Sequence, residues 1–124
     1  MPYSDEAMLN WAEKRIYLCC GRTDMRKSIN GLTALVQESF GMDPFDRSIY
    51  VLCNRNRNRL KILEWDENGF WLYFKRLEKG RFRWPQPGDD PVMTLTSDEL
   101  SILLNGAKVE LKLKRNEVWE RNIS

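Results

Sequence analysis

The chain has 124 residues, of which 42% are hydrophobic and five are tryptophan. This length and apolar content are those of one folded domain with a real core, spanning residues 1–124, and not of a disordered chain. No run of about 18 apolar residues occurs, which excludes a membrane-spanning helix, and the start "MPYSDEAMLNWAEKR" lacks the pattern of a secretory signal. We therefore expect a cytoplasmic protein with no membrane partner.

Two residue types limit the chemistry. The chain has no histidine, which removes the commonest general base and every Ser-His or Cys-His nucleophile pair. It has three cysteines, too few for a structural zinc site, which needs about four Cys or His ligands. Cys19 and Cys20 are adjacent, so in a strand they point to opposite faces and do not bridge. We expect no metal and no cofactor.

The net charge of +2 is unevenly distributed. Residues 14–27 carry +4, from five basic residues and one acidic, and residues 55–83 carry +5, from nine basic and four acidic. A basic middle between acidic ends favours a polyanionic partner. An ordinary solvated surface explains it about equally well.

The first half of the chain predicts two helices and a strand. Ser4 is suited to cap a short helix over residues 5–14, and "RIYLCC" (residues 15–20) predicts a strand. Thr23 is a suitable N-cap for the main amphipathic helix, expected over residues 24–40. One face of this helix carries apolar residues at helical spacing, namely Met25, Ile29, Leu32, Val36 and Phe40.

The second half predicts an antiparallel β-meander, so the expected fold class is α+β with the main helix packed on the sheet. Strands are expected in residues 47–53, 59–65, 70–77 and 81–84, separated by turn signals. Alternation places Leu60, Ile62 and Glu64 on one face and Lys61, Leu63 and Trp65 on the other, so both faces are partly covered.

A short C-terminal helix is expected next. Thr96 and Glu99 form a capping box, and Gly106 is a stop residue. Residues 107–113 alternate like a strand that is exposed on one side.

Two basic segments of the meander are candidate nucleic-acid contacts. The stretch "NRNRNR" at residues 54–59 is either a solvated hairpin tip, for which asparagine suits the backbone, or a tip whose arginines contact phosphates. The stretch "FKRLEKGRFRWP" is either an edge hairpin with core aromatics or a surface where bases stack on Phe82 and Trp84. Every second turn of a meander lies at the same end of the sheet, so the two segments should be neighbours. The candidate residues are Arg55, Arg57, Arg59, Lys75, Arg76, Lys79, Arg81 and Arg83.

The order of several short motifs resembles a known family. "TDMRK", "NGL", "LKIL.W", "GF" and "KRLE.GRF.WP" follow one another over residues 15–106. In this combination they resemble the accessory protein TnpB of insertion-sequence family sixty-six, the product of that element's second open reading frame. The resemblance covers a core of about residues 15–106 and leaves 107–124 as an extension.

The resemblance implies a non-enzymatic accessory of bacterial transposition that accompanies a separate transposase. Together with the basic segments, it leads us to expect that the protein binds DNA, the cognate transposase, or both. Two alternatives stay open. One is a protein-interaction module that adds a strand to a partner's sheet. The other is a nuclease in which Glu64, Asp66 and Glu67 hold magnesium. Against the nuclease, we expect the triple alanine variant of these carboxylates to fold and to support transposition.

Overall fold

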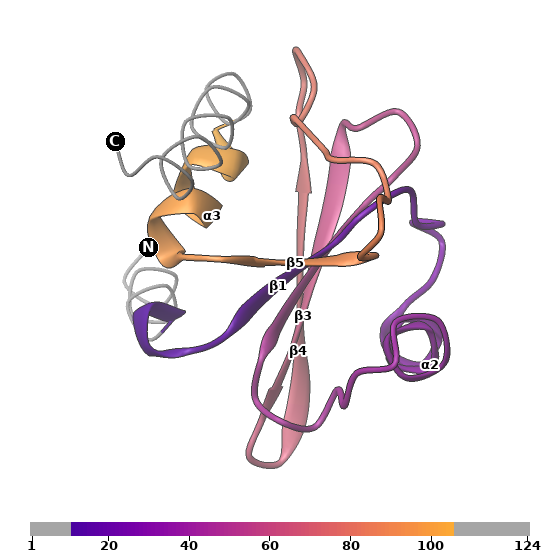
Figure 1. Ribbon diagram of the computed structural model, residues 1–124, viewed down its shortest axis with the longest axis vertical. Coiled ribbons are helices and arrows are strands. Elements are labelled where there is room, and N and C mark those ends of the chain that lie inside the picture. Colours follow the sequence, from indigo (N-terminus) through magenta and orange to yellow (C-terminus); the bar gives the residue numbers. More distant parts are fainter. Residues whose placement is uncertain (1–10, 106–124) are drawn as a thin grey trace.

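The computed structural model describes residues 11–105 as a five-stranded mixed sheet with a helix on each side (Figure 1). The strands are β1 (Ile16–Cys19), β2 (Ile49–Cys53), β3 (Arg59–Asp66), β4 (Gly69–Arg76) and β5 (Val92–Leu95), and their order in the sheet is β4-β3-β2-β1-β5. The helices are a 3-10 turn η1 (Trp11–Glu13), α2 (Ile29–Glu38) and α3 (Ser97–Leu104). The α+β class is therefore confirmed.

The meander forms only part of the sheet. β2, β3 and β4 pair antiparallel in sequence order, as expected. However, β1 pairs parallel with β2, and β5 pairs antiparallel with β1. A parallel pair needs a long crossover connection, and residues 20–48 with α2 supply it. The expected antiparallel meander is therefore present, as one part of a mixed sheet.

Residues 81–84 do not form a strand, so that expectation is wrong. They belong to a connection without regular structure that runs from β4 to β5. Its backbone is held by hydrogen bonds from the end of β1: the N–H of Cys20 donates to Pro91 O (2.8 Å), and that of Gly21 to Pro85 O (3.1 Å). Proline has no backbone N–H and so cannot donate to a sheet ladder, but its carbonyl can still accept, as Pro85 and Pro91 do here.

The main helix begins at Ile29, with Ser28 and not Thr23 as its N-cap, and is therefore shorter than residues 24–40. The residues before it are held to the sheet, because Lys61 Nζ donates to the carbonyls of Met25 (2.9 Å) and Lys27 (2.8 Å). The predicted packing face is nevertheless confirmed. Leu32 and Val36 are buried, and Met25, Ile29 and Phe40 pack against the same cluster.

The short C-terminal helix α3 is confirmed with its capping box. The Glu99 N–H donates to Thr96 Oγ1, and the Thr96 N–H donates to Glu99 Oε1. Leu100 and Leu103 are buried on the sheet. The expected helix at 5–14 lies mostly outside the described residues, and Gly106 and the expected strand at 107–113 lie wholly outside them.

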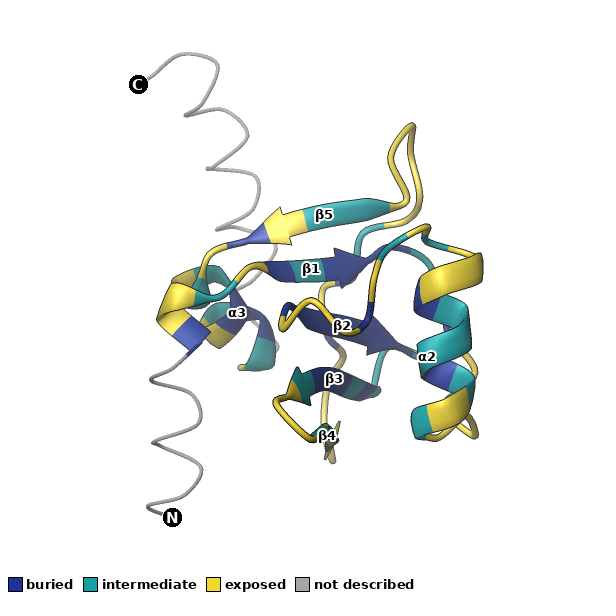
Figure 2. Ribbon diagram, turned by 90° about the horizontal axis from the view of Figure 1, so that it is seen from below, coloured by how far each residue is buried: buried dark blue, intermediate teal, exposed yellow. Residues whose placement is uncertain are grey.

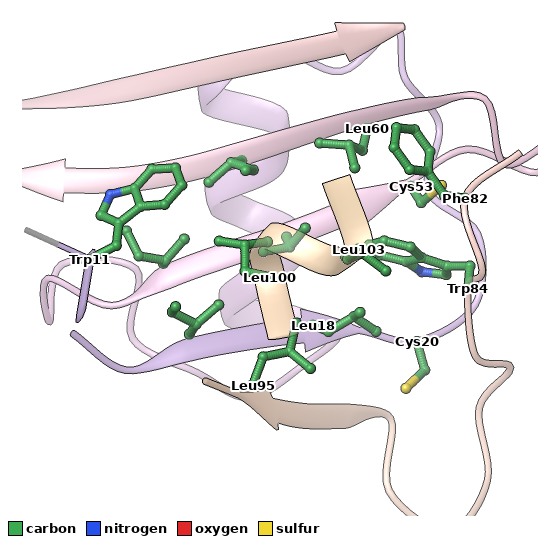
Figure 3. Close-up of a cluster of buried hydrophobic side chains, with 14 residues drawn as sticks. Trp11, Leu18, Cys20, Cys53, Leu60, Phe82, Trp84, Leu95, Leu100 and Leu103 are labelled. Carbon is green, nitrogen blue, oxygen red and sulfur yellow. The ribbon is translucent and has the colours of Figure 1, made fainter. Parts of the chain in front are cut away.

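Two hydrophobic cores sandwich the sheet, as the alternation of β3 predicts. The α2-side core is built from Cys19, Leu32, Val36, Tyr50, Leu52 and Leu63. The α3-side core is larger and includes Trp11, Leu18, Cys20, Leu60, Phe82, Trp84, Leu100 and Leu103 (Figure 3). Cys19 and Cys20 thus point to opposite faces, and both are free thiols. Every residue of β2 is buried, as Figure 2 shows.

No helix in the part of the chain that the structure describes is long and apolar enough to cross a membrane.

The docking of α2 on the sheet can be tested by truncating its buried face. We expect Leu32→Ala to lower the free energy of unfolding by about 2–5 kcal/mol, because the change removes a fully buried side chain and leaves a cavity. Urea denaturation followed by circular dichroism measures this loss. Asn30→Ala, at an exposed position of the same helix, is the control and should change stability by less than about 0.5 kcal/mol. Equal effects of the two substitutions would contradict the packing.

Candidate nucleic-acid interface

The loop between β2 and β3 is organised by its asparagines. The side-chain oxygen of Asn54 accepts hydrogen bonds from the backbone N–H groups of Asn58 and Arg59, both at 3.0 Å, and Asn54 Nδ2 donates to Asn58 Oδ1. Arg57 has a φ of 61°, in the left-handed region. The Asn54 side chain therefore holds the loop backbone, and the Asn58 side chain is bonded to Asn54. The arginines are the charged groups of this loop.

This loop and the connection after β4 are neighbours, as the order of turns predicts. The N–H of Leu77 donates to Asn58 O (2.8 Å), and that of Phe82 donates to Arg57 O (2.6 Å). Phe82 is fully buried, whereas Arg81 before it is exposed. The two basic segments thus meet at one end of the sheet.

Two arginines face each other across the last strand pair. In the β3–β4 ladder Arg59 is directly opposite Arg76, so both side chains lie on the α2 side of the sheet. Like charges at directly opposite positions destabilise a sheet. Arg76 has a partner in Glu78 (2.8 Å), but this ion pair is well exposed and contributes little.

A hollow of about 1090 Å³ lies on the α2 side beside this pair. Its lining is mostly basic, polar and aromatic: Thr23, Asp24, Met25, Arg26, Asn54, Arg55, Asn56, Arg59, Lys61, Leu72 and Phe74. Lys61 Nζ, which holds the 25–27 backbone, lies 5.9 Å from the centre of the Phe74 ring. The hollow therefore places two candidate arginines, Arg55 and Arg59, beside an exposed aromatic ring.

The positive charge at this end is only partly compensated. Arg26 is paired with Asp24 through three side-chain hydrogen bonds of 2.9–3.2 Å, and its guanidinium holds the pKa of that carboxyl at about 2. Within residues 11–105, no carboxylate forms a salt bridge with Arg55, Arg57, Arg59, Lys79 or Arg81. We refer to these five residues and Arg76 as the basic end.

The remaining predicted residues lie elsewhere. Lys75 points to the α3 side, where its Nζ donates to Leu104 O (2.8 Å), and Arg83 is exposed between two buried aromatics. Those aromatics, Phe82 and Trp84, belong to the α3-side core, and Trp84 Nε1 donates to Cys19 O. The interpretation that bases stack on Phe82 and Trp84 is therefore wrong, because neither ring is accessible.

Sequence reasoning did not include Arg26, Lys61 or Phe74 among the site residues. Lys61 could have been found, because alternation in β3 places it on the same face as Arg59. The 23–26 segment could not have been found from the sequence, because only the folded structure shows that Lys61 holds it beside the hollow.

Comparison with known proteins supplies the family. A family model described as "IS66 Orf2 like protein" matches residues 14–114. The chain belongs to the IS66 Orf2-like family. It is 35% identical over 92 residues to the uncharacterized proteins y4hO and y4jC of Sinorhizobium fredii; each match covers 74% of this chain, and 79% and 78% of the two relatives. No solved structure matches it.

Membership in the IS66 Orf2-like family makes this chain an accessory protein of an insertion sequence and not a member of a known enzyme family. The motifs that carry the resemblance meet in its structure. Lys61, from "LKIL.W", holds the backbone of "TDMRK", and "KRLE.GRF.WP" is bonded to the 54–59 loop through Leu77 and Phe82. All three motifs therefore lie around the basic end of this IS66 Orf2-like protein.

Two of the three carboxylates proposed for a nuclease, Glu64 and Asp66, have structural partners. Glu64 is 5% exposed and accepts hydrogen bonds from Trp11 Nε1 (3.2 Å), the Tyr73 hydroxyl (3.1 Å) and Lys14 Nζ. Asp66 accepts from Trp71 Nε1 at 3.0 Å. The expectation that all three carboxylates can be replaced without harm to the fold is corrected for Glu64, because it is buried and holds three donors.

Other catalytic groups are equally unsupported in the described part of the IS66 Orf2-like chain. Residues 11–105 contain no cluster of three Cys, Asp or Glu side chains suited to a metal ion. Burial raises the pKa of the Cys19 and Cys53 thiols to about 12, so neither is a thiolate nucleophile at neutral pH.

The structural role of Glu64 can be measured directly. We expect Glu64→Ala to lower the free energy of unfolding by about 2–4 kcal/mol, because it strands the donors of Trp11 and Tyr73 and the Lys14 ammonium. Glu67→Ala, in the exposed turn beyond β3, serves as control and should cost less than about 1 kcal/mol. Chemical denaturation compares the two, and a Glu64→Ala protein as stable as wild type would disprove the role.

Proposed function

We propose that this protein is a non-enzymatic accessory of transposition that acts in the bacterial cytoplasm, binds DNA through its basic end and works beside the separate transposase. The observation that carries the proposal is the Arg59–Arg76 pair. Two guanidinium groups at directly opposite ladder positions repel each other, and a phosphate placed between them turns that repulsion into attraction.

The neighbours of this pair extend it into a path for a phosphate backbone. Arg55 lines the same hollow as Arg59, and Arg57 is joined by its carbonyl to the connection that carries Lys79 and Arg81. Guanidinium groups bind phosphate oxygens in a bidentate geometry. Contacts of this kind fix the position of the protein on DNA and carry little sequence information.

The fixed loop geometry also favours binding. The side chain of Asn54 and the buried Phe82 hold the two basic segments in place before any ligand arrives. Less conformational entropy is then lost on binding than with a mobile basic tail. A candidate role in protein interaction alone needs none of these arginines, and salt dependence distinguishes it from DNA binding.

The test is fluorescence anisotropy of short DNA duplexes at several salt concentrations. If about four phosphates are contacted, the slope of log K against log salt should be near −3.6. The triple variant Arg55→Ala, Arg59→Ala, Arg76→Ala should reduce the magnitude of the slope by about 2.7, and by a similar amount on unrelated sequences. Arg57 is left unchanged, so that the residue whose left-handed backbone shapes the loop stays the same.

Lys75→Met is the matched control. It removes one positive charge from the same strand as Arg76 but on the opposite face of the sheet, so the slope should stay within about 0.3 of wild type. The proposal is wrong if wild type does not bind DNA at low salt, or if the triple variant and the control behave alike.

A further inference from the structure

β4 is a long, apolar strand at a free edge of the sheet. It pairs with β3 on one side, and on its other side no element of residues 11–105 pairs with it (Figure 2). Five of its eight residues are apolar or aromatic, "FWLYF" at 70–74, and Trp71 and Phe74 are each 55% exposed. β5, at the other edge, has only four residues. Proteins usually protect such an edge, because it pairs readily with another strand.

The backbone groups of this edge can be assigned from the ladder. The N–H of Leu77 bonds to Asn58 O, which fixes the pair 58–77 as hydrogen-bonded. Hydrogen-bonded pairs alternate along an antiparallel ladder, so Tyr73 and Lys75 direct their N–H and C=O towards β3. The corresponding groups of Phe70, Leu72 and Phe74 therefore point outward, away from the sheet.

The sequence of this edge is nearly symmetric about Leu72. Read from either end, residues 70–74 give phenylalanine, an aromatic residue, leucine, an aromatic residue and phenylalanine. In an antiparallel pair of two copies centred on Leu72, Phe70 would lie opposite Phe74 and Trp71 opposite Tyr73. Cross-strand aromatic pairs of this kind stabilise a sheet. The outward groups of residues 70, 72 and 74 would form the hydrogen-bonded pairs of the new ladder.

Charge at the two ends of β4 is also self-complementary. Lys75 and Arg76 lie at its C-terminal end, and the exposed turn with Asp66 and Glu67 precedes its N-terminal end. In the antiparallel arrangement the basic end of one strand comes beside the acidic turn of the other copy. A partner with an unrelated strand would not match both the aromatic order and the charges.

We propose that the occupant of this edge is a second copy of the chain, which pairs β4 with β4 antiparallel about Leu72. The dimer has one continuous sheet with a two-fold axis perpendicular to it. This axis keeps both α2 sides, and therefore both basic ends, on the same face of the dimer. The pairing requires no DNA, so its test is independent of the function proposed above.

Disulfide trapping tests the pairing and its register in the full chain. Cα atoms of a hydrogen-bonded pair are about 5.5 Å apart, a distance that suits a disulfide. Leu72→Cys should therefore form a covalent dimer when treated with diamide, seen on non-reducing gels. Wild type should form none, because its three cysteines are buried.

Phe70→Cys and Phe74→Cys supply the controls for register. Each residue is about four positions, or roughly 14 Å, from its own copy in the dimer, so neither variant should cross-link alone. A mixture of the two should cross-link, since residue 70 of one copy faces residue 74 of the other. Cross-linking of Phe74→Cys alone at the level of Leu72→Cys would overturn the register.

An edge-blocking variant tests the dimer without oxidation. Phe74→Pro removes an outward N–H and no bond to β3, so it should raise the dimer dissociation constant at least tenfold in sedimentation velocity. Phe74→Val, which keeps the N–H, is the control and should lose less affinity than the proline variant. The proposal is overturned if wild type sediments as a monomer up to about 100 μM, or if the edge binds a different protein while the chain itself stays monomeric.

Discussion

Burial of β2 on both faces is the constraint on which the rest of the structure depends. All five of its residues are buried, with Ile49, Val51 and Cys53 in the α3-side core and Tyr50 and Leu52 in the α2-side core. A strand of this kind requires cover on both sides of the sheet. α2 supplies one cover, and α3 with Trp11, Phe82 and Trp84 supplies the other.

The need for that second cover also creates the basic end. Phe82 and Trp84 pin the connection after β4 to the core, and each buried aromatic contributes about 1.5–3 kcal/mol of apolar burial. A cross-strand pair changes stability by only roughly 0.2–1 kcal/mol, so this stabilisation exceeds the repulsion between Arg59 and Arg76. Arg81 and Arg83 alternate with the two buried rings, so the core fixes where these two charges are exposed. The same packing excludes the rings from any contact with bases.

Local patterns predicted much of this structure. Alternation in β3 gave the correct facing of Leu60, Ile62 and Leu63, and the Thr96–Glu99 capping box marked the start of α3. The adjacency of the two basic segments followed from turn order. These features depend on residues close in sequence, which is why sequence reasoning reached them.

Features set by long-range contacts were missed. The parallel pairing of β1 with β2 depends on a crossover of 29 residues, from 20 to 48, and no local signal specifies it. α2 begins later than predicted because Lys61 holds the backbone that precedes it. In the acidic "EWDENG" stretch, the structural role of Glu64 depends on Trp11 and Lys14, about 50 residues away in the sequence.

Arginine footprinting by mass spectrometry tests the central claim most directly. Phenylglyoxal modifies accessible guanidinium groups, and the chain carries an internal control at the opposite end of the sheet, where Arg15 and Arg47 are exposed just before β1 and β2. The account predicts that duplex DNA protects Arg55, Arg59 and Arg76, leaves Arg15 and Arg47 reactive, and loses its protective effect at high salt. Equal protection of both ends, or protection of Arg15 and Arg47 alone, would contradict it.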